Sequence, residues 1–266
     1  MTAVHPRPGL RARLEAGLPK PLSHVVPVEH PETPDVVTRR RRVVAAVSVV
    51  GAGLLGASLS TRPGSARFYG ATLGVAAVWT AGGVLSGPLH LGWIQRRDDQ
   101  LRRPVVAPVV TGVGAFGFFY ACALAARRIP PLDDAISRVL VFAEQGEERL
   151  VLLTTLANGL GEEVFFRGAL FAALGERHPV AASTAVYTLA TTTTRNPALV
   201  LAAGVMGTLF GLQRRASKGL QAPVLTHLTW SALMVRYLPP LFRRAHPGDG
   251  QRLADRPDPT DPKGVR

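Results

Sequence analysis

The chain has 266 residues, of which 47% are hydrophobic, and carries a net charge of +13 from 31 Lys and Arg against 18 Asp and Glu. Its single cysteine, Cys122, excludes an intramolecular disulfide framework and a zinc site built from several cysteines. The arginines cluster beside long apolar blocks without interleaved aromatic residues, so the charge indicates contact with anionic membrane lipids and argues against nucleic acid as a partner.

The chain begins with a proline-rich segment, residues 1–37, in which charges are scattered and no apolar period develops. A segment of this kind buries too little apolar surface to offset the entropy of ordering, so we predict a mobile tail. A second tail, residues 241–266, is rich in Asp, Pro and Arg. We expect both termini to be disordered.

Long apolar blocks lie between the tails, and blocks of about 18 or more apolar residues are typical of transmembrane helices. The predicted fold is therefore all-α, a polytopic transmembrane helical bundle with about seven spans, within a range of roughly six to eight. We divide it into N-terminal transmembrane helices over 38–131 and a core over 132–240. The predicted spans are 43–60, 68–94, 104–126, 150–174, 179–194, 197–213 and 221–240.

Two further patterns refine this bundle. Residues 132–149 mix apolar side chains with five acidic ones, which indicates an interfacial or partly inserted helix. The pairs Gly70 with Gly74 and Gly207 with Gly211 have the small-xxx-small spacing that lets membrane helices approach closely.

The positions of the arginines predict the orientation. The cluster at 39–42 and the connectors at 96–103 and 214–218 fall on one side of the membrane if the predicted spans are right, and that side is expected to be cytoplasmic. The chain has few lysines and abundant Arg, Ala, Gly and Pro, a bias typical of GC-rich bacterial genomes. We therefore expect an integral protein of a bacterial plasma membrane with a cytoplasmic N-terminus.

Two adjacent glutamates, Glu162 and Glu163, lie within the predicted span 150–174. Because a charge at membrane depth costs roughly 2.5–3.5 kcal/mol on insertion scales, they are candidates for a functional site. Arg167 follows Glu163 by four residues and shares its helical face, so it can hold Glu163 ionised, either as part of a site or as a packing clamp. Glu162 projects about 100° away and lacks that partner, which favours a carboxylate able to take a proton from water.

Other polar groups interrupt the apolar blocks further along the chain. His227 and Ser231 are again four residues apart, and the histidine can donate to an oxyanion, act as acid or base, bind metal, or simply be a satisfied core residue. Thr191 begins a run of four threonines. Threonines of this kind can bond to their own helix backbone, so the run is also open to a structural interpretation.

Residues 135–240 resemble the CPBP family, which includes type II CAAX prenyl endopeptidases and bacteriocin-processing or immunity proteins. The run Glu162, Glu163 and Arg167 matches the family's Glu-Glu-x-x-x-Arg motif. Tyr187 and Thr191 fall on its Phe-x-x-x-His motif, with threonine at the place of the histidine. The third motif, His-x-x-x-Asn, falls on His227 and Ser231, with serine at the place of the asparagine.

The resemblance implies an intramembrane endopeptidase that cleaves a membrane-associated protein or peptide. In that comparison Glu162 is the base that activates water, Glu163 and Arg167 brace the site, and His227 with Ser231 stabilises the oxyanion. The two departures leave open a second class, a catalytically impaired relative that acts as a binding, immunity or resistance factor. A third class, an ion or proton transporter, lacks the repeated half-structure common in such folds.

No cofactor is expected. Glu162, Glu163 and His227 would suffice in number to hold a catalytic zinc ion. However, adjacent glutamates diverge on a helix, so we favour a metal-free carboxylate mechanism.

Overall fold

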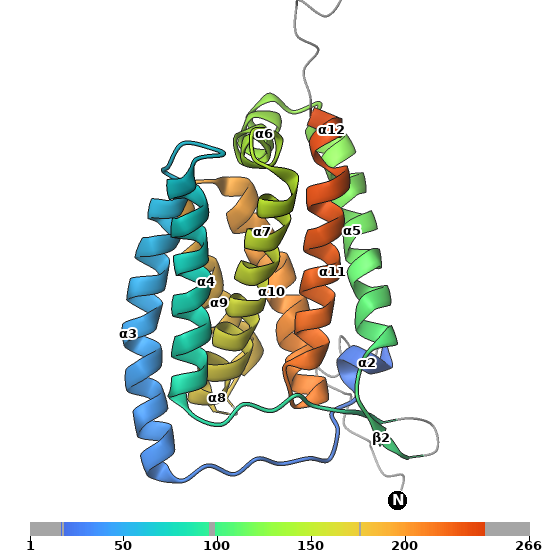
Figure 1. Cartoon of the computed structure of the whole chain (residues 1–266). Helices are drawn as coiled ribbons and strands as arrows, with labels where there is room; N and C mark the ends of the chain where they lie inside the picture. The colour runs from blue at the N-terminus through green and yellow to red at the C-terminus, as the bar shows by residue number, and fades with distance from the viewer. Residues whose placement is uncertain (1–16, 18, 96–98, 176, 243–266) are drawn as a thin grey trace, which may run out of the picture.

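The computed structural model of this chain describes residues 17, 19–95, 99–175 and 177–242, and its apolar blocks form long helices packed side by side (Figure 1). The elements, in chain order, are α2 (Lys20–Ser23), α3 (Pro34–Ser58), α4 (Ala66–Ser86), β1 (Ile94–Gln95), β2 (Leu101–Arg102), α5 (Val106–Ala126), α6 (Pro130–Glu144), α7 (Glu148–Glu162), the π-helix η1 (Glu163–Leu170), α8 (Phe171–Leu174), α9 (Pro179–Thr191), the 3-10 turn η2 (Thr192–Thr194), α10 (Pro197–Ser217), α11 (Gln221–Tyr237) and α12 (Pro239–Phe242). The predicted all-α class is confirmed, and the two strands form a short antiparallel hairpin.

Four helices of the described chain, α3, α4, α5 and α10, are long and apolar enough to cross a membrane by length and composition. Two predicted spans, 150–174 and 179–194, correspond to helical runs at 148–174 and 179–194, while α11 has 17 residues. The number of seven spans stays a prediction.

The outward faces of the bundle are apolar. Val49 on α3, Val110 on α5, Leu189 on α9 and Leu201 on α10 are each more than half exposed. Contiguous apolar surface of this extent is unusual on a soluble monomer and typical of a surface that contacts lipid. The structure is therefore that of an integral membrane protein.

The N-terminal segment differs from the predicted mobile tail. Residues 20–23 form α2, which packs against α10, and the Val26 side chain is 3% exposed. The Val26 N–H donates to the Ala216 carbonyl (3.0 Å). The prediction of a mobile tail is therefore wrong over residues 20–37. Its boundary was misplaced because α3 starts at Pro34, nine residues before the predicted span, and includes the arginines at 39–42. The predicted tails at 1–16 and 243–266 lie outside the described residues.

The arginine-bearing connectors lie together at one end of the bundle, the lower end in Figure 1. Arg40 on α3 donates from Nη2 to the Pro88 carbonyl (2.9 Å), and the Trp93 N–H donates to the Ser217 carbonyl at the end of α10 (2.9 Å). The described parts of the three arginine-bearing segments that were predicted to share one side of the membrane, 39–42, 96–103 and 214–218, are thus at the same end of the bundle. At the opposite end α6 lies across the bundle (Figure 1).

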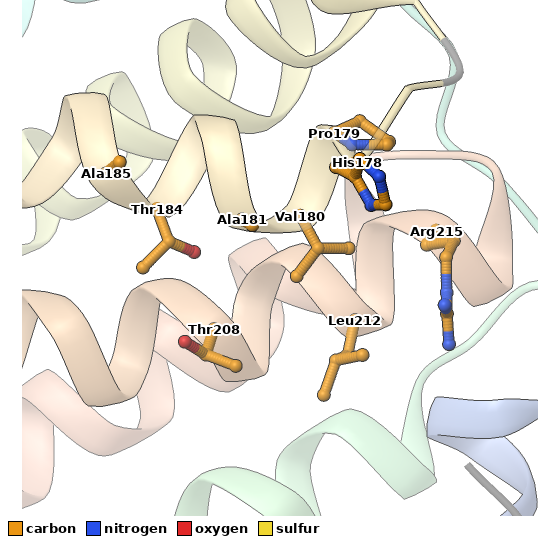
Figure 2. A pocket seen from close by; sticks show the side chains of 9 residues that line it. All are labelled: His178, Pro179, Val180, Ala181, Thr184, Ala185, Thr208, Leu212 and Arg215. Atoms are coloured by element: carbon orange, nitrogen blue, oxygen red, sulfur yellow. The ribbon is translucent and has the colours of Figure 1, made fainter. Parts of the chain in front are cut away.

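The predicted glycine contacts are half right. A Cβ at Gly207 would lie 3.1 Å from the Thr184 side chain, and one at Gly211 would lie 3.0 Å from Val180, so these glycines bring α10 close to α9. A groove runs beside this contact (Figure 2). The same prediction is wrong for Gly70 and Gly74, where a Cβ would meet nothing within 4 Å.

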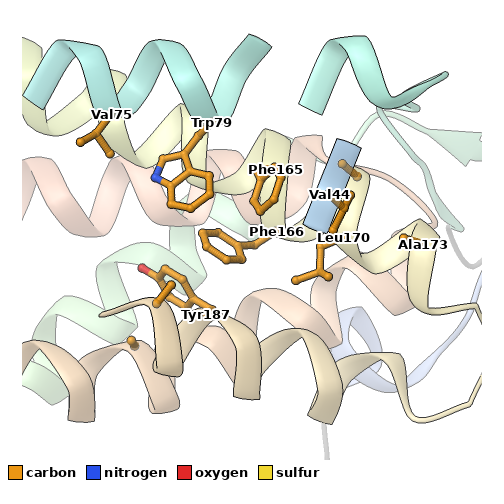
Figure 3. Packing of buried hydrophobic residues seen from close by; sticks show 11 residues of the cluster. Val44, Val75, Trp79, Phe165, Phe166, Leu170, Ala173 and Tyr187 are labelled. Atoms are coloured by element: carbon orange, nitrogen blue, oxygen red, sulfur yellow. The ribbon is translucent and has the colours of Figure 1, made fainter. Parts of the chain in front are cut away.

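An aromatic core holds the site helix against its neighbours (Figure 3). Trp79 on α4 packs against Phe165 and Phe166 of η1, with ring centroids 4.6 and 4.9 Å apart. Phe166 in turn packs against Tyr187 of α9 (4.8 Å). These fully or nearly buried rings fix the rotation of η1 between α4 and α9.

Candidate active site

The adjacent glutamates lie where the helix changes its winding. Glu162 is the last residue of α7 and Glu163 is the first residue of η1, which continues the same helical run to Leu170. π-helical segments are rare and are frequently found at functional sites. The apolar pattern of the sequence gave no sign of this winding.

Glu163 is the centre of a fully buried ionic cluster. Its Oε1 lies 2.9 Å from Nδ1 of His227 on α11 and 3.4 Å from Nη1 of Arg167. Glu163 and Arg167 are 0% exposed, and their predicted pairing is confirmed. An ionised carboxylate only accepts hydrogen bonds. With Glu163 in that form, the Nδ1–H of His227 donates a hydrogen bond to its Oε1.

The other ring nitrogen of His227 faces α7. A Cβ at Gly159 would lie 3.4 Å from Nε2, and Gly159 precedes Glu162 by three residues. The imidazole also stacks on Phe210 of α10, with centroids 4.7 Å apart. His227 is thereby held with Nδ1 on Glu163 and Nε2 toward the turn that carries Glu162.

Aromatic rings surround the Arg167 guanidinium. Its Cζ lies 4.6 Å from the ring centroid of Tyr187, 5.2 Å from Phe210 and 5.9 Å from Phe166. Cation–π attraction over these rings supports a positive charge that water does not reach. A Cβ at Gly207 would lie 3.3 Å from Nη2, so a larger residue there would crowd the guanidinium from the α10 side.

Glu162 points to different partners. The Tyr187 hydroxyl donates to its Oε2 (2.6 Å) and the Asn158 side-chain amide donates to its Oε1 (3.1 Å). Within the described part of the chain, Glu162 thus lacks Arg167 as a partner, as expected, but it has two neutral partners that were not predicted. Asn158 lies four residues earlier on the same helix and was accessible to spacing arguments, whereas Tyr187 reaches Glu162 only because α9 packs beside it.

Several buried polar atoms of the site have no hydrogen-bond partner among the described residues: Asn158 Oδ1, Glu163 Oε2, and Nε, Nη1 and Nη2 of Arg167. Buried polar groups in native proteins are normally paired with protein or with ordered water. The site therefore holds donors and acceptors that the described residues leave unpaired and that lie out of reach of bulk solvent.

The two remaining predicted residues occupy different positions. Thr191 is buried, and its hydroxyl donates to the Tyr187 carbonyl in its own helix (2.8 Å), which is the structural alternative for this threonine. Ser231 is 5% exposed and follows His227 by one turn of α11. The structure thus places Ser231 beside the histidine and engages the Thr191 hydroxyl with backbone.

The donor set does not fit the zinc site considered from the sequence. Within the described ranges, no group of three His, Cys, Asp or Glu side chains is placed to hold a metal ion. Glu163 Oε1 is bound to His227, and Glu162 turns away to Tyr187 and Asn158.

Residues 147–233 match the family model described as Type II CAAX prenyl endopeptidase Rce1-like. The matched segment extends from the residue before α7 into α11 and includes every site residue named from the motifs. The family resemblance inferred from the motifs is confirmed. A search of curated proteins and a search of solved structures each gave no match.

Proposed function

We propose that this protein is an intramembrane endopeptidase that hydrolyses a peptide bond of a membrane-associated protein or peptide, using water activated by Glu162. The family match supports a CAAX-protease-like intramembrane peptidase. We assign the base to Glu162 because the two glutamates have different partners. Glu163 is bound to His227 and Arg167, whereas Glu162 is held by the two neutral donors Tyr187 and Asn158.

This division leaves Glu162 able to accept a proton. A carboxylate offers about four acceptor positions, and the hydrogen bonds from Tyr187 and Asn158 use two of them. A water molecule on a remaining position can transfer its proton to Glu162 while its oxygen attacks the carbonyl carbon of the substrate. The proton then passes to the nitrogen of the departing amine as the C–N bond breaks.

The developing oxyanion needs donors on the opposite side of the reacting carbon. His227 is held by Glu163 through Nδ1, and its Nε2 donates whenever that nitrogen carries a proton; Ser231 supplies a hydroxyl one turn later. Donors fixed before the reaction stabilise such a charge most effectively in a site shielded from water. Glu163 and Arg167 act as positioning residues that hold His227.

For the whole chain we propose seven spans in a bacterial plasma membrane. The end that carries Arg40, the β1–β2 hairpin and Arg214 is assigned to the cytoplasm because positive residues favour that side. Membrane lipids are the proposed surroundings, and no nucleic acid is a proposed partner.

The test compares the protein termini of membranes from cells that lack the gene and express either wild type or Glu162→Gln. We expect new termini that depend on Glu162, because glutamine keeps the shape of the side chain but cannot accept the proton. Glu148→Gln, at the exposed start of α7, is the matched control and is expected to behave as wild type. Identical termini with equal amounts of inserted protein would overturn the assignment and favour a non-catalytic binding protein.

A further inference from the structure

The groove between α9 and α10 has a volume of about 510 Å³, and its basic side chains lie at one end. His178 and Arg215 lie at one end, Val180 and Leu212 lie beyond them, and Thr184 with Thr208 lies at the other end (Figure 2). Ala181 and Ala185 complete the wall on the α9 side and are exposed. Among the residues that the structure describes, the side chains that line the groove include no carboxylate.

The groove follows from the packing of the two helices. Gly207 and Gly211 draw α10 against α9 on the inward side. On the outward side the small side chains of Ala181 and Ala185 leave space between the helices. Leu189 and Leu201, on the same two helices, are 69% and 66% exposed, so the groove opens on the apolar surface assigned to lipid.

The polar end of the groove lies at the arginine-bearing end of the bundle. Arg215 is in the last turn of α10, two residues before Ser217, whose carbonyl accepts the Trp93 N–H. His178 is the N-cap of α9 and Pro179 its first residue, so the positive end of the helix dipole points to the same place. An Arg, a His and a helix N-terminus together are complementary to a phosphate group.

We propose that this groove binds an anionic phospholipid. The phosphate lies against Arg215, His178 and the N-terminus of α9, and one acyl chain follows Val180, Ala181 and Leu212 toward the middle of the membrane. Basic groups at the membrane surface complement the phosphate, and the apolar side chains below them complement an acyl chain. This site goes beyond the proposed peptidase activity, because none of its residues belongs to the glutamate cluster.

A bound lipid at this position has a structural consequence. Thr184, at the deep end of the groove, precedes Tyr187 by three residues, and Tyr187 donates to Glu162. An acyl chain between α9 and α10 therefore supports the helix that orients the proposed base. The lipid acts as a packing element and takes no part in the chemistry.

The test measures retention of phosphatidylglycerol and phosphatidylcholine by the full chain in detergent, using native mass spectrometry and thermal melting. We expect phosphatidylglycerol to be retained and to raise the melting temperature more than phosphatidylcholine. Arg215→Gln is expected to weaken the phosphatidylglycerol effect on the order of tenfold, since a charge-assisted contact is lost. Ala181→Trp fills the groove and is expected to abolish retention of the lipid.

Two matched variants control for general effects. Arg42→Gln removes one exposed charge at the same end of the bundle, and Leu189→Trp places a tryptophan on α9 outside the groove; both variants are expected to retain phosphatidylglycerol. Equal effects of the two lipids, or equal effects of Arg215→Gln and Arg42→Gln, would overturn the proposal. So would inorganic phosphate that stabilises the protein as well as the lipid does, because the acyl chain would then be irrelevant.

Discussion

The neighbouring carboxylates Glu162 and Glu163 acquire opposite surroundings because consecutive helical side chains diverge by about 100°. Glu163 turns toward α11 and meets His227, while Glu162 turns toward α9 and meets Tyr187. The negative charge of Glu163 is thereby balanced inside the protein. The hydrogen bonds that Glu162 accepts from Tyr187 and Asn158 come from neutral groups, which suits the role of base that we propose for it.

The bracing role of Arg167 predicts a loss of stability on substitution. Arg167→Met removes one partner of a buried ion pair, and such a change costs about 3–5 kcal/mol because the other charge stays buried. We expect a lower melting temperature in detergent and lower abundance in membranes. The double variant Glu163→Gln/Arg167→Met removes both charges and is expected to recover part of the loss.

Arg149→Met is the control for this prediction, since Arg149 is exposed at the start of α7. It is expected to melt as wild type does. An Arg167→Met protein as stable and abundant as the control would rule out the bracing role.

The sequence could predict the site contacts that are local in the chain. The four-residue spacing was sufficient for Glu163 and Arg167, and the same rule applies to Asn158 and Glu162. The contacts from Glu162 to Tyr187 and from Glu163 to His227 span 25 and 64 residues. They depend on how α9 and α11 pack, which no spacing rule supplies. His227 was singled out as a histidine in an apolar block, but spacing could not place it against Glu163.

At the scale of the elements, close approach depends on which face of a helix carries its glycines. Gly70 with Gly74 and Gly207 with Gly211 have the same spacing, yet only the second pair faces another helix. The decisive glycine on α4 is Gly83, where a Cβ would lie 2.8 Å from the Val164 carbonyl oxygen of η1. The spacing shows that a helix can be approached closely, but the packing decides where.

This difference predicts opposite effects of two identical substitutions on α4. Gly83→Ala forces α4 away from η1 and is expected to destabilise the protein by about 1–3 kcal/mol, as overpacking does. Gly74→Ala meets open space and is expected to be neutral or to stabilise by about 0.5–1 kcal/mol. Thermal melting of both variants in the same detergent distinguishes them, and equal melting temperatures would contradict the close α4–η1 contact.

Helix existence was predictable and helix winding was not. The apolar blocks located the helical runs. The apolar pattern of the π-helical stretch from Glu163 to Leu170, however, is equally compatible with an α-helix of 3.6 residues per turn. The start of α3 was misplaced because the predicted span began only after the cluster of four arginines at 39–42. Arginine is a good helix former, and here Arg40 is buried against Glu32, Ser86 and Pro88.

At the scale of the molecule, residues 24–33 form an N-terminal strap across the arginine-bearing end. His30 stacks on His90, with ring centroids 3.5 Å apart and planes within 5°. Burial and the neighbouring His90, Arg214 and Lys218 lower the pKa of His30 below 6.5. The pKa of His90 is also lowered, first by burial and then by the positive charge of Arg214. Arg40 lowers it further, and Glu32 opposes the shift.

The strap is therefore expected to loosen in acid. Because both pKa values are lower in the folded state, the unfolded or detached strap binds more protons below pH 6.5. The contribution of the two histidines to the stability of the strap is complete above pH 6.5. It is lost as the pH falls through their pKa values in the folded state. Hydrogen exchange of residues 24–33, corrected for intrinsic rates, is expected to be faster at about pH 5.5 than at about pH 7.5.

The double variant His30→Phe/His90→Phe keeps two stackable rings and removes both titrating groups. Its strap is expected to exchange at the same corrected rate at both values of pH. A wild-type strap that shows no dependence on pH would contradict the role assigned to the histidine pair.

The placement of His227 on the last long helix has a consequence for biogenesis. On the seven-span arrangement that we propose, the ribosome releases the helix bearing Glu162, Glu163 and Arg167 before α11 has been synthesised. Each charge resists partition into lipid by roughly 2.5–3.5 kcal/mol, so the translocon must hold this helix beside α4, already inserted, until its remaining partner arrives. Chains that end before residue 221 would leave the glutamate pair without His227 and become substrates for membrane quality control.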